Sequence, residues 1–246
     1  MINDWITPDW PAPRNVKALF TTRNGGVSSG NYSSLNLGDH VADDPSAVAH
    51  NRTLLRSVLP GEPRWLKQVH GAAPIQVDDV DGVVEGDAAF SQRAGTVCAV
   101  LVADCLPVLL CNRAGSVVGV IHAGWRGLAA GVIERTVISM GSQQTPLLAW
   151  LGPAIGSNHY EVGDDVYQPF IQHDQNAALA FARHAHGKWL ADLYLLARQR
   201  LAQAGVTEVY GGSECTFSDP ARFFSHRRDG NAGNTGRMAG LIWLAE

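Results

Sequence analysis

Three closely spaced apolar runs constrain the fold of this chain more than any other feature. Residues 96–103 and 117–121 are apolar and rich in β-branched side chains, and residues 108–111 form a shorter run between them. Runs of this length and composition are typical of buried strands. The polar turn at 112–115 joins the second run to the third in the manner of a hairpin. The sequence therefore predicts a buried sheet near the middle of the chain.

Further strands and helices are predicted on both sides of these runs. Strands are expected at residues 16–22, 65–69, 75–77, 147–151, 206–210 and 237–244, with 75–77 paired to 65–69. Helices are expected from Pro45 to 59 with Asp44 as N-cap, from 128 to about 140, from 164 to about 182 with a break, and over 190–204. Because strands and helices intermix without strict alternation, we expect an α/β (α+β mixed) fold. One domain would span residues 1–246, with the first 15 or so residues as a peripheral arm.

Composition argues against several classes of protein. Apolar residues make up 46% of the 246 residues and charged residues 17%, which is typical of a folded globular chain. The net charge of −4 gives no electrostatic basis for binding nucleic acid or an anionic membrane. We expect no signal peptide, because the N-terminus has no basic region followed by an apolar one, and no membrane helix, because no apolar run reaches about 18 residues. The cysteines are too few for a disulfide framework, so a reducing cytoplasm is the expected setting; they are Cys98, Cys105, Cys111 and Cys215.

Three side chains that can bind a metal lie at predicted strand ends. They are His70, Cys105 and His122. Two imidazoles and one thiolate, with the fourth position open, match a catalytic zinc site. A structural zinc site would more often use four ligands with C-x-x-C pairs, which this chain lacks. The alternative is that these are three unrelated buried residues.

A glycine-rich turn follows the strand that ends at His122. Gly124 and Gly127 flank Trp125 and Arg126, and an apolar helical pattern follows. Functional side chains in α/β domains often sit where a strand gives way to such a turn and a helix. The free N–H groups of a helix beginning near Leu128 would also suit an anion.

Several short motifs occur in the order that one protein family shows. They are T-T-R-N-G-G-V-S at 21–28, K-Q-V-H-G at 67–71, D-C-L-P at 104–107, H-A-G-W-R-G at 122–127, F-F-S-H-R-R-D-G at 223–230 and a T-G-R that ends at Arg237. From about residue 17 to its C-terminus the chain resembles the YfiH-like or YlmD-like "laccase domain" family, also labelled multicopper polyphenol oxidase. Several motifs in one order are far more specific than any single motif.

The resemblance implies a fold, a metal and an activity. The fold would be mixed sheets packed face to face and flanked by helices, similar to the catalytic domain of cytotoxic necrotizing factor. Zinc would be bound by His70, Cys105 and His122. Members are described as purine nucleoside phosphorylases, acting on adenosine, inosine, guanosine and methylthioadenosine, that also deaminate adenosine. Many relatives carry cysteines after the G-P-x-I-G turn, where this chain has residues 157–159, S-N-H, so no role of those cysteines carries over.

Two other activities are associated with the family. Some bacterial members are credited with peptidoglycan editing, in which L-Ser is removed from the UDP-muramyl precursor. A cysteine hydrolase with Cys105 as nucleophile and His122 as base would suit that amide bond. Copper polyphenol oxidase chemistry is disfavoured, because it needs about ten histidines, many in H-x-H pairs. This chain has nine histidines and one such pair, at 184–186, so Zn²⁺ is expected rather than Cu²⁺. A non-enzymatic metal-binding module is disfavoured by the open ligand set.

Phosphorolysis also requires cations that hold phosphate. Candidates in or beside the motifs are Arg23, Lys67, Arg227, Arg228 and Arg237, with Arg126 beside Cys105 and His122 as a catalytic residue. We expect a phosphate site near the metal, lined by Arg23 and by Arg227 or Arg228. Four aromatic residues are candidates for stacking on a purine or for core packing; they are Trp125, Tyr160, Phe223 and Phe224. The expected partners are a nucleoside and phosphate, and the expected assembly is a monomer or small homo-oligomer.

Overall fold

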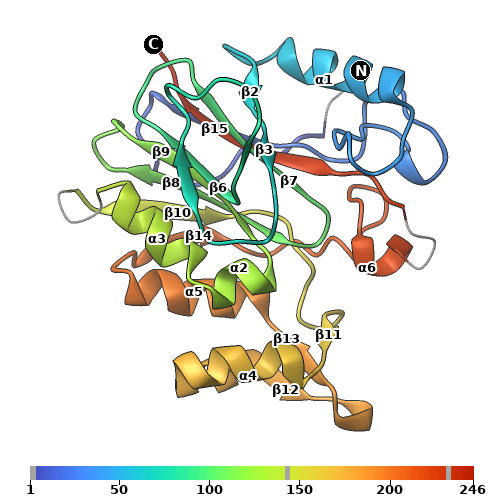
Figure 1. Cartoon of the computed structure of the whole chain (residues 1–246), viewed down its shortest axis with the longest axis vertical. Coiled ribbons are helices and arrows are strands. Elements are labelled where there is room, and N and C mark those ends of the chain that lie inside the picture. The colour runs from blue at the N-terminus through green and yellow to red at the C-terminus, as the bar shows by residue number, and fades with distance from the viewer. Residues whose placement is uncertain (1–3, 142–144, 231–233) are drawn as a thin grey trace.

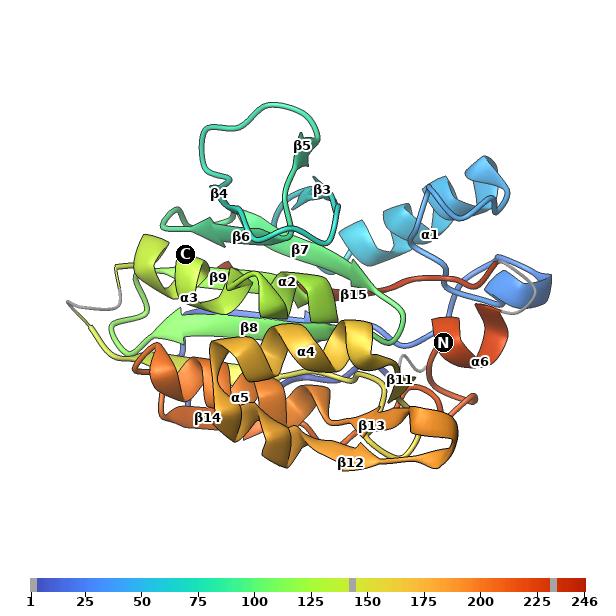
Figure 2. The ribbon, with the colours of Figure 1, turned by 60° about the horizontal axis from the view of Figure 1, so that its bottom comes forward.

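The apolar runs form two mixed β-sheets that pack face to face (Figures 1 and 2). This computed structural model describes residues 4–141, 145–230 and 234–246. One sheet has the order β1 (Val16–Phe20), β15 (Met238–Leu244), β7 (Val97–Val102) and β2 (Pro63–Arg64). The other has the order β14 (Glu208–Gly211), β10 (Leu147–Leu151), β8 (Leu106–Asn112), β9 (Val118–Ala123), β6 (Ala88–Ser91) and β4 (Pro74–Gln76).

Both sheets combine parallel and antiparallel pairs, as the intermixed sequence pattern predicts. The edge strands β2, β4 and β14 pair in parallel with β7, β6 and β10. The remaining pairs in the two sheets are antiparallel, including the β8–β9 hairpin at the centre of the larger sheet. The predicted α/β class with mixed sheets is therefore confirmed.

Alternating side chains of the central strands fill separate layers of the core. In β7, Val100 and Val102 point to the layer between the sheets, where they meet Val118 and Val120 of β9. Ile121 of the same strand belongs to the layer under the helices. Because both faces of these strands are covered, their sequences are almost uninterrupted apolar runs.

Helices cover the outer faces of the two sheets. Helix α1 (Pro45–Arg56) packs on the smaller sheet. Helices α2 (Trp125–Ala129), α3 (Val132–Ser139) and α5 (Leu193–Gln203) pack on the larger one. Helix α4 (Asp164–His173) and the sheet β11 (Glu161–Val162), β13 (Trp189–Ala191), β12 (Phe181–Arg183) lie beyond α5, at the bottom of Figure 1. The remaining strands are β3 (Leu66–Lys67) and β5 (Val84–Glu85), which pair with each other, and the remaining α-helix is the short α6 (His226–Asp229).

Helix α1 begins as predicted, and two other predicted helices need correction. The carboxylate of Asp44 accepts a hydrogen bond from Ser46 N–H, so it caps α1. The helix expected to continue to residue 140 is split into α2 and α3, because Gly131 adopts a φ of 85°. The start of the helix expected at 190–204 is strand β13. Helix α5 begins after Asp192, whose carboxylate accepts from Leu195 N–H.

The strand expected at 65–69 is also corrected. Within it only Leu66–Lys67 is a strand, β3, which pairs with β5, and the separate strand β2 lies just before Trp65 and pairs with β7. Strand β4, expected as their partner, pairs with β6. The switch of partner at Trp65 leaves residues 68–71 as a loop, and that loop carries His70.

Two other features follow from the described residues. All four cysteines are free thiols. No described helix combines the length and apolar character needed to cross a membrane.

Candidate active site

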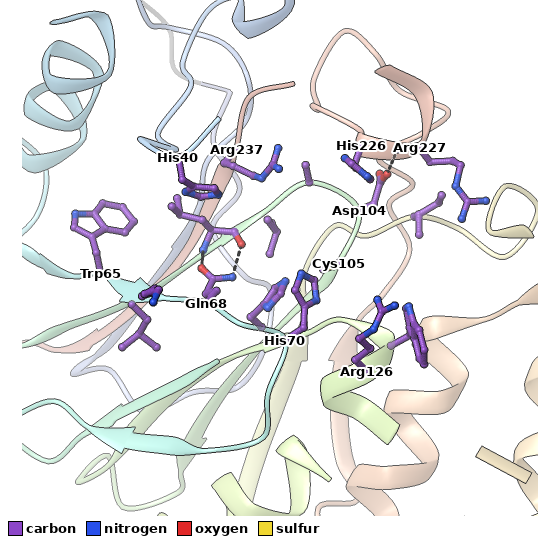
Figure 3. Close-up of a pocket in the computed structure, with 18 of the residues that line it drawn as sticks. His40, Trp65, Gln68, His70, Asp104, Cys105, Arg126, His226, Arg227 and Arg237 are labelled. Atoms are coloured by element: carbon purple, nitrogen blue, oxygen red, sulfur yellow. Dashed lines mark hydrogen bonds between the residues drawn. The ribbon is translucent and has the colours of Figure 1, made fainter. Parts of the chain in front are cut away.

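His70, Cys105 and His122 converge at one end of the sheets (Figure 3). His70 lies in the loop after β3, Cys105 lies in the turn between β7 and β8, and His122 lies within β9. One ligand atom from each of the three lies within 4.8 Å of the other two. The two imidazole rings meet edge to face, with 4.8 Å between their centroids. Three segments far apart in the sequence thus build one cluster, as predicted.

The cluster fits a divalent metal of borderline softness. Two imidazole nitrogens and one thiolate suit zinc and leave a coordination position open. The backbone leaves space for these side chains at Gly124, where a Cβ atom would lie 2.8 Å from His70 Nδ1 and 3.1 Å from Cys105 Sγ. His70 itself has a φ of 58°, a left-handed conformation that is unusual for a non-glycine residue and is often found at functional sites.

Asp87, which the sequence analysis did not single out, holds two of the three side chains in place. Its fully buried carboxylate accepts hydrogen bonds from the backbone N–H groups of Val69, His70 and Gly71, at 3.1, 3.0 and 2.6 Å. The same carboxylate lies 2.8 Å from Nδ1 of His122. A carboxylate on one ring nitrogen fixes the tautomer and leaves the other nitrogen free to bind a metal.

Burial and charge oppose each other at this cluster. Burial raises the pKa of Asp87, but hydrogen bonds from His122 and Gly71 outweigh it, so the pKa lies below its ordinary value. Burial likewise lowers the pKa of His122, but the neighbouring Cys105 and Asp87 raise it to about 9. The pKa of His70 is lowered by burial and by His122. A positive charge on His122 is therefore favoured beside Asp87, whereas a positive charge on His70 is disfavoured.

The cluster opens into a cavity of about 790 Å³. Figure 3 shows His40 and Trp65 on one side of His70 and Cys105, and Arg126, Arg227 and His226 on the other. Leu66, Val83 and Leu101 add apolar surface, and Arg237 lies between the two sides. The cavity thus has room for a small organic molecule on a partly apolar, partly cationic surface.

Four of the predicted cations line this cavity, including Arg237, which donates to the carbonyls of Thr235 and Gly236. Arg126 lies over the ring of Trp125, with 4.2 Å from its Cζ to the ring centroid. Arg227 donates from Nη1 to the carbonyl of Glu161 at 2.7 Å. Lys67 also lines the cavity, but its Nζ lies 3.4 Å from a carboxylate oxygen of Glu85. Arg126 and Arg227 have no carboxylate oxygen within 4.0 Å among the residues that the structure describes.

Arg23 and Arg228 have a different environment and do not line the cavity. Arg23 donates to the carbonyls of Ser33 and Pro220, and its guanidinium lies over the ring of Phe224. Arg228 donates to three carbonyls, those of Thr216, Phe217 and Phe223, and also pairs with Asp229. Of the arginines expected at a phosphate site, the structure brings only Arg227 to the cavity, because loop carbonyls satisfy the other two.

Two of the four candidate aromatic residues lie at the cavity. Trp125 and Tyr160 line the cavity, whereas Phe223 and Phe224 are fully buried in the core. Asp104, directly before Cys105, was missed although it lies in the D-C-L-P motif.

The buried carboxylate of Asp104 ties the Cys105 turn to the C-terminal part of the chain. It accepts hydrogen bonds from Thr216 Oγ1 at 2.6 Å, from Ser225 Oγ at 3.0 Å and from the Arg227 backbone N–H at 2.6 Å. The last of these bonds places Arg227 beside the cluster.

Comparison with known proteins identifies the family of this chain. A family model described as "Multi-copper polyphenol oxidoreductase laccase" matches residues 17–245. The chain is 51% identical over 246 residues to a purine nucleoside phosphorylase of Pseudomonas aeruginosa, with all of both chains covered. It is 50% identical over 242 residues to the purine nucleoside phosphorylase YfiH of Escherichia coli, covering 97% of this chain and 98% of that one.

A solved structure from Neisseria meningitidis shares the fold. It superposes with a TM-score of 0.93 at 48% identity, over 99% of this chain and 100% of that one. The agreement covers both sheets and the segments that carry the cluster. The chain therefore belongs to the laccase-like YfiH family.

Proposed function

We propose that this protein is a zinc-dependent purine nucleoside phosphorylase with adenosine deaminase activity. The observation that carries the proposal is a cavity in which the His70–Cys105–His122 cluster adjoins two arginines without carboxylate partners, Arg126 and Arg227. The names of relatives at about half identity support the phosphorylase activity. Adenosine, inosine, guanosine and methylthioadenosine are the proposed nucleosides.

The chain's own residues have distinct roles in this proposal. Phosphorolysis breaks the bond between ribose C1′ and the purine and forms a bond from C1′ to a phosphate oxygen. Arg126 and Arg227 bind and orient the phosphate through charge-assisted hydrogen bonds. Trp65 and Trp125 give the purine aromatic surface in the cavity.

His70, Cys105 and His122 are the proposed metal ligands, and Asp87 keeps His122 oriented. A bound zinc would supply a Lewis acid for phosphate and a means of lowering the pKa of water for deamination. Multicopper oxidase chemistry needs several copper centres, whereas the described residues contain one group of three or more metal-binding side chains within ligand distance. Zinc is therefore proposed in place of copper.

A product assay tests both activities. Purified protein is incubated with adenosine, with and without phosphate, and the products are separated by chromatography. We expect adenine and ribose 1-phosphate only when phosphate is present. Inosine should form in both conditions and should be converted in part to hypoxanthine when phosphate is present. Absence of any phosphate-dependent release of adenine would contradict the phosphorylase proposal.

A second function is favoured by one specific observation. The Cys105 thiol lies beside the His122 ring, whose Nδ1 lies 2.8 Å from the Asp87 carboxylate, and a cysteine hydrolase uses the same order of groups. Such an enzyme would suit the removal of L-Ser from a UDP-muramyl precursor. Release of L-Ser by metal-free protein, with no adenosine cleavage, would favour this function over the first.

A further inference from the structure

Arg237 lines the cavity beside the metal-binding cluster, and the proposed function gives it no role. It lies directly before β15, at the end of the smaller sheet that faces the cluster. In Figure 3 its side chain lies between His40 and His226, on the same side of the cavity as the turn that carries Cys105. It is thus placed over the middle of the cavity, between the two sides that a bound nucleoside would span.

A neighbouring loop holds Arg237 in one place. Its backbone N–H donates to Asn36 Oδ1 at 2.9 Å, and its carbonyl accepts from Leu37 N–H at 3.1 Å. The stem of its side chain passes close over Gly38, where a Cβ atom would lie only 2.8 Å from Arg237 Cγ. Because both the backbone and the stem are fixed, the guanidinium reaches the cavity in a preorganised position.

Part of this guanidinium has no partner in the protein. Nη1 donates to the carbonyls of Thr235 and Gly236, whereas Nε and Nη2 make no hydrogen bond within the residues that the structure describes. The same residues place no carboxylate oxygen within 4.0 Å of it. Burial lowers the pKa of Arg237 and the neighbouring Cys105 and Asp104 raise it in part, but a guanidinium stays charged at neutral pH. Arg237 therefore offers charged N–H donors to a ligand.

The proposed phosphate site fixes the direction in which the purine departs. Arg126 and Arg227 lie on one side of the cluster, and His40 and Trp65 lie on the other (Figure 3). In a single displacement, the attacking phosphate and the departing base lie on opposite faces of the ribose. A purine that leaves a ribose held beside the two arginines therefore moves away from them, toward Arg237 and Trp65.

We propose that Arg237 is a catalytic residue that stabilises the negative charge on the departing purine through hydrogen bonds from Nε and Nη2 to a ring nitrogen. The inference rests on the proposed phosphorolysis and adds the group that acts on the leaving base. A phosphate oxygen forms a bond to C1′, the bond from C1′ to N9 breaks, and its electron pair passes to the purine. The purine then takes up a proton from water, and the phosphate ester releases one. Because the guanidinium keeps its protons, Arg237 acts by electrostatic stabilisation.

A pair of substrates with different leaving groups tests this role. Guanosine loses its base as an anion, whereas the base of 7-methylguanosine already carries a positive charge and leaves as a neutral molecule. Arg237→Met should lower kcat for phosphorolysis of guanosine about 100-fold, because one preorganised donor is lost. It should leave kcat for 7-methylguanosine and the KM for phosphate nearly unchanged. Arg237→Lys keeps the positive charge and should restore part of the lost rate.

The second substrate also controls for misfolding, because a damaged site would slow both reactions equally. Arg113→Met is the matched control, since Arg113 is exposed in the turn at the other end of β8 and pairs with Glu208. It should resemble the wild type with both substrates. An equal loss with both substrates in Arg237→Met, or a raised KM for phosphate, would overturn the inference and leave the phosphorylase proposal standing. If the wild type cleaves neither nucleoside in phosphate, the phosphorylase proposal fails and this inference fails with it.

Discussion

At the scale of single residues, Asp87 connects the loop of His70 to the ring of His122. Asp87→Asn keeps the size of the side chain but removes the charge that orients the ring and favours a bound cation. We expect zinc affinity to fall by about 10- to 100-fold. Competition with a chromogenic chelator measures this affinity. Asp81→Asn, at an exposed position, should bind zinc like the wild type, and equal affinity in both variants would contradict the role of Asp87.

The sequence predicts the cluster but not the residues that support it. His70, Cys105 and His122 are recognisable because they are metal-binding types beside predicted strands. Asp87 carries no such signal, since its partners come from a loop and a strand that only the fold brings together. The same limit applies to arginines. Arg23 and Arg227 both lie in basic motifs that contain glycine. Only the fold shows that the guanidinium of Arg23 is hydrogen-bonded to backbone carbonyls, whereas Arg227 lies at the cavity.

At the scale of elements, Arg200 of α5 anchors the helices that follow His122. Its side chain is buried, and its Nε lies 2.6 Å from Oε1 of Glu134 in α3. Its Nη2 donates a hydrogen bond of 2.9 Å to the carbonyl of Leu128 in α2. Arg200→Ala should lower the free energy of unfolding by about 3 kcal/mol, because both partners lose their contact. Urea denaturation measures the change. Arg198→Ala, on the same helix, should cost less, and equal losses would contradict an anchoring role for Arg200.

Long elements are predictable here, whereas several short ones are not. Strands β7, β8 and β9 are found where uninterrupted apolar runs predict them, because burial on both faces demands such runs. The two-residue strand β2 and the three-residue strand β13 were not predicted, because so few residues carry too little pattern to show a strand. Strand β4 was predicted, but with the wrong partner. The partners of these short strands are chosen by tertiary packing, as the switch at Trp65 shows.

At the scale of the whole molecule, Asp78 makes stability depend on pH. Burial raises the pKa of this carboxyl, but hydrogen bonds from Ser91 and Gln92 outweigh it, so the pKa in the folded state is lowered. The ionised Asp78 therefore stabilises the folded state fully when the pH is above the pKa of the carboxyl in the unfolded chain, about 3.9. This stabilisation is lost as the pH falls through the lower pKa that Asp78 has in the folded state. Asp78→Asn should lower the free energy of unfolding by about 1–2 kcal/mol at pH 7.

The difference between wild type and Asp78→Asn should narrow as the pH falls below about 4. Denaturant unfolding at a series of pH values measures it. Asp79→Asn alters an exposed pair with Arg93 and should have little effect at any pH. A difference for Asp78→Asn that stays constant from pH 7 to pH 3 would show that charge on Asp78 does not contribute.

The central claim is that Cys105 acts as a metal ligand together with His70 and His122. The most direct test is adenosine phosphorolysis by protein whose zinc content has been measured, before chelation, after chelation and after zinc is returned. We expect activity to disappear with the metal and to return with about one zinc per chain, with no adduct in the intact-protein mass. Full activity in verified metal-free protein, or a stable substrate adduct mapped to Cys105, would contradict this and identify Cys105 as a nucleophile.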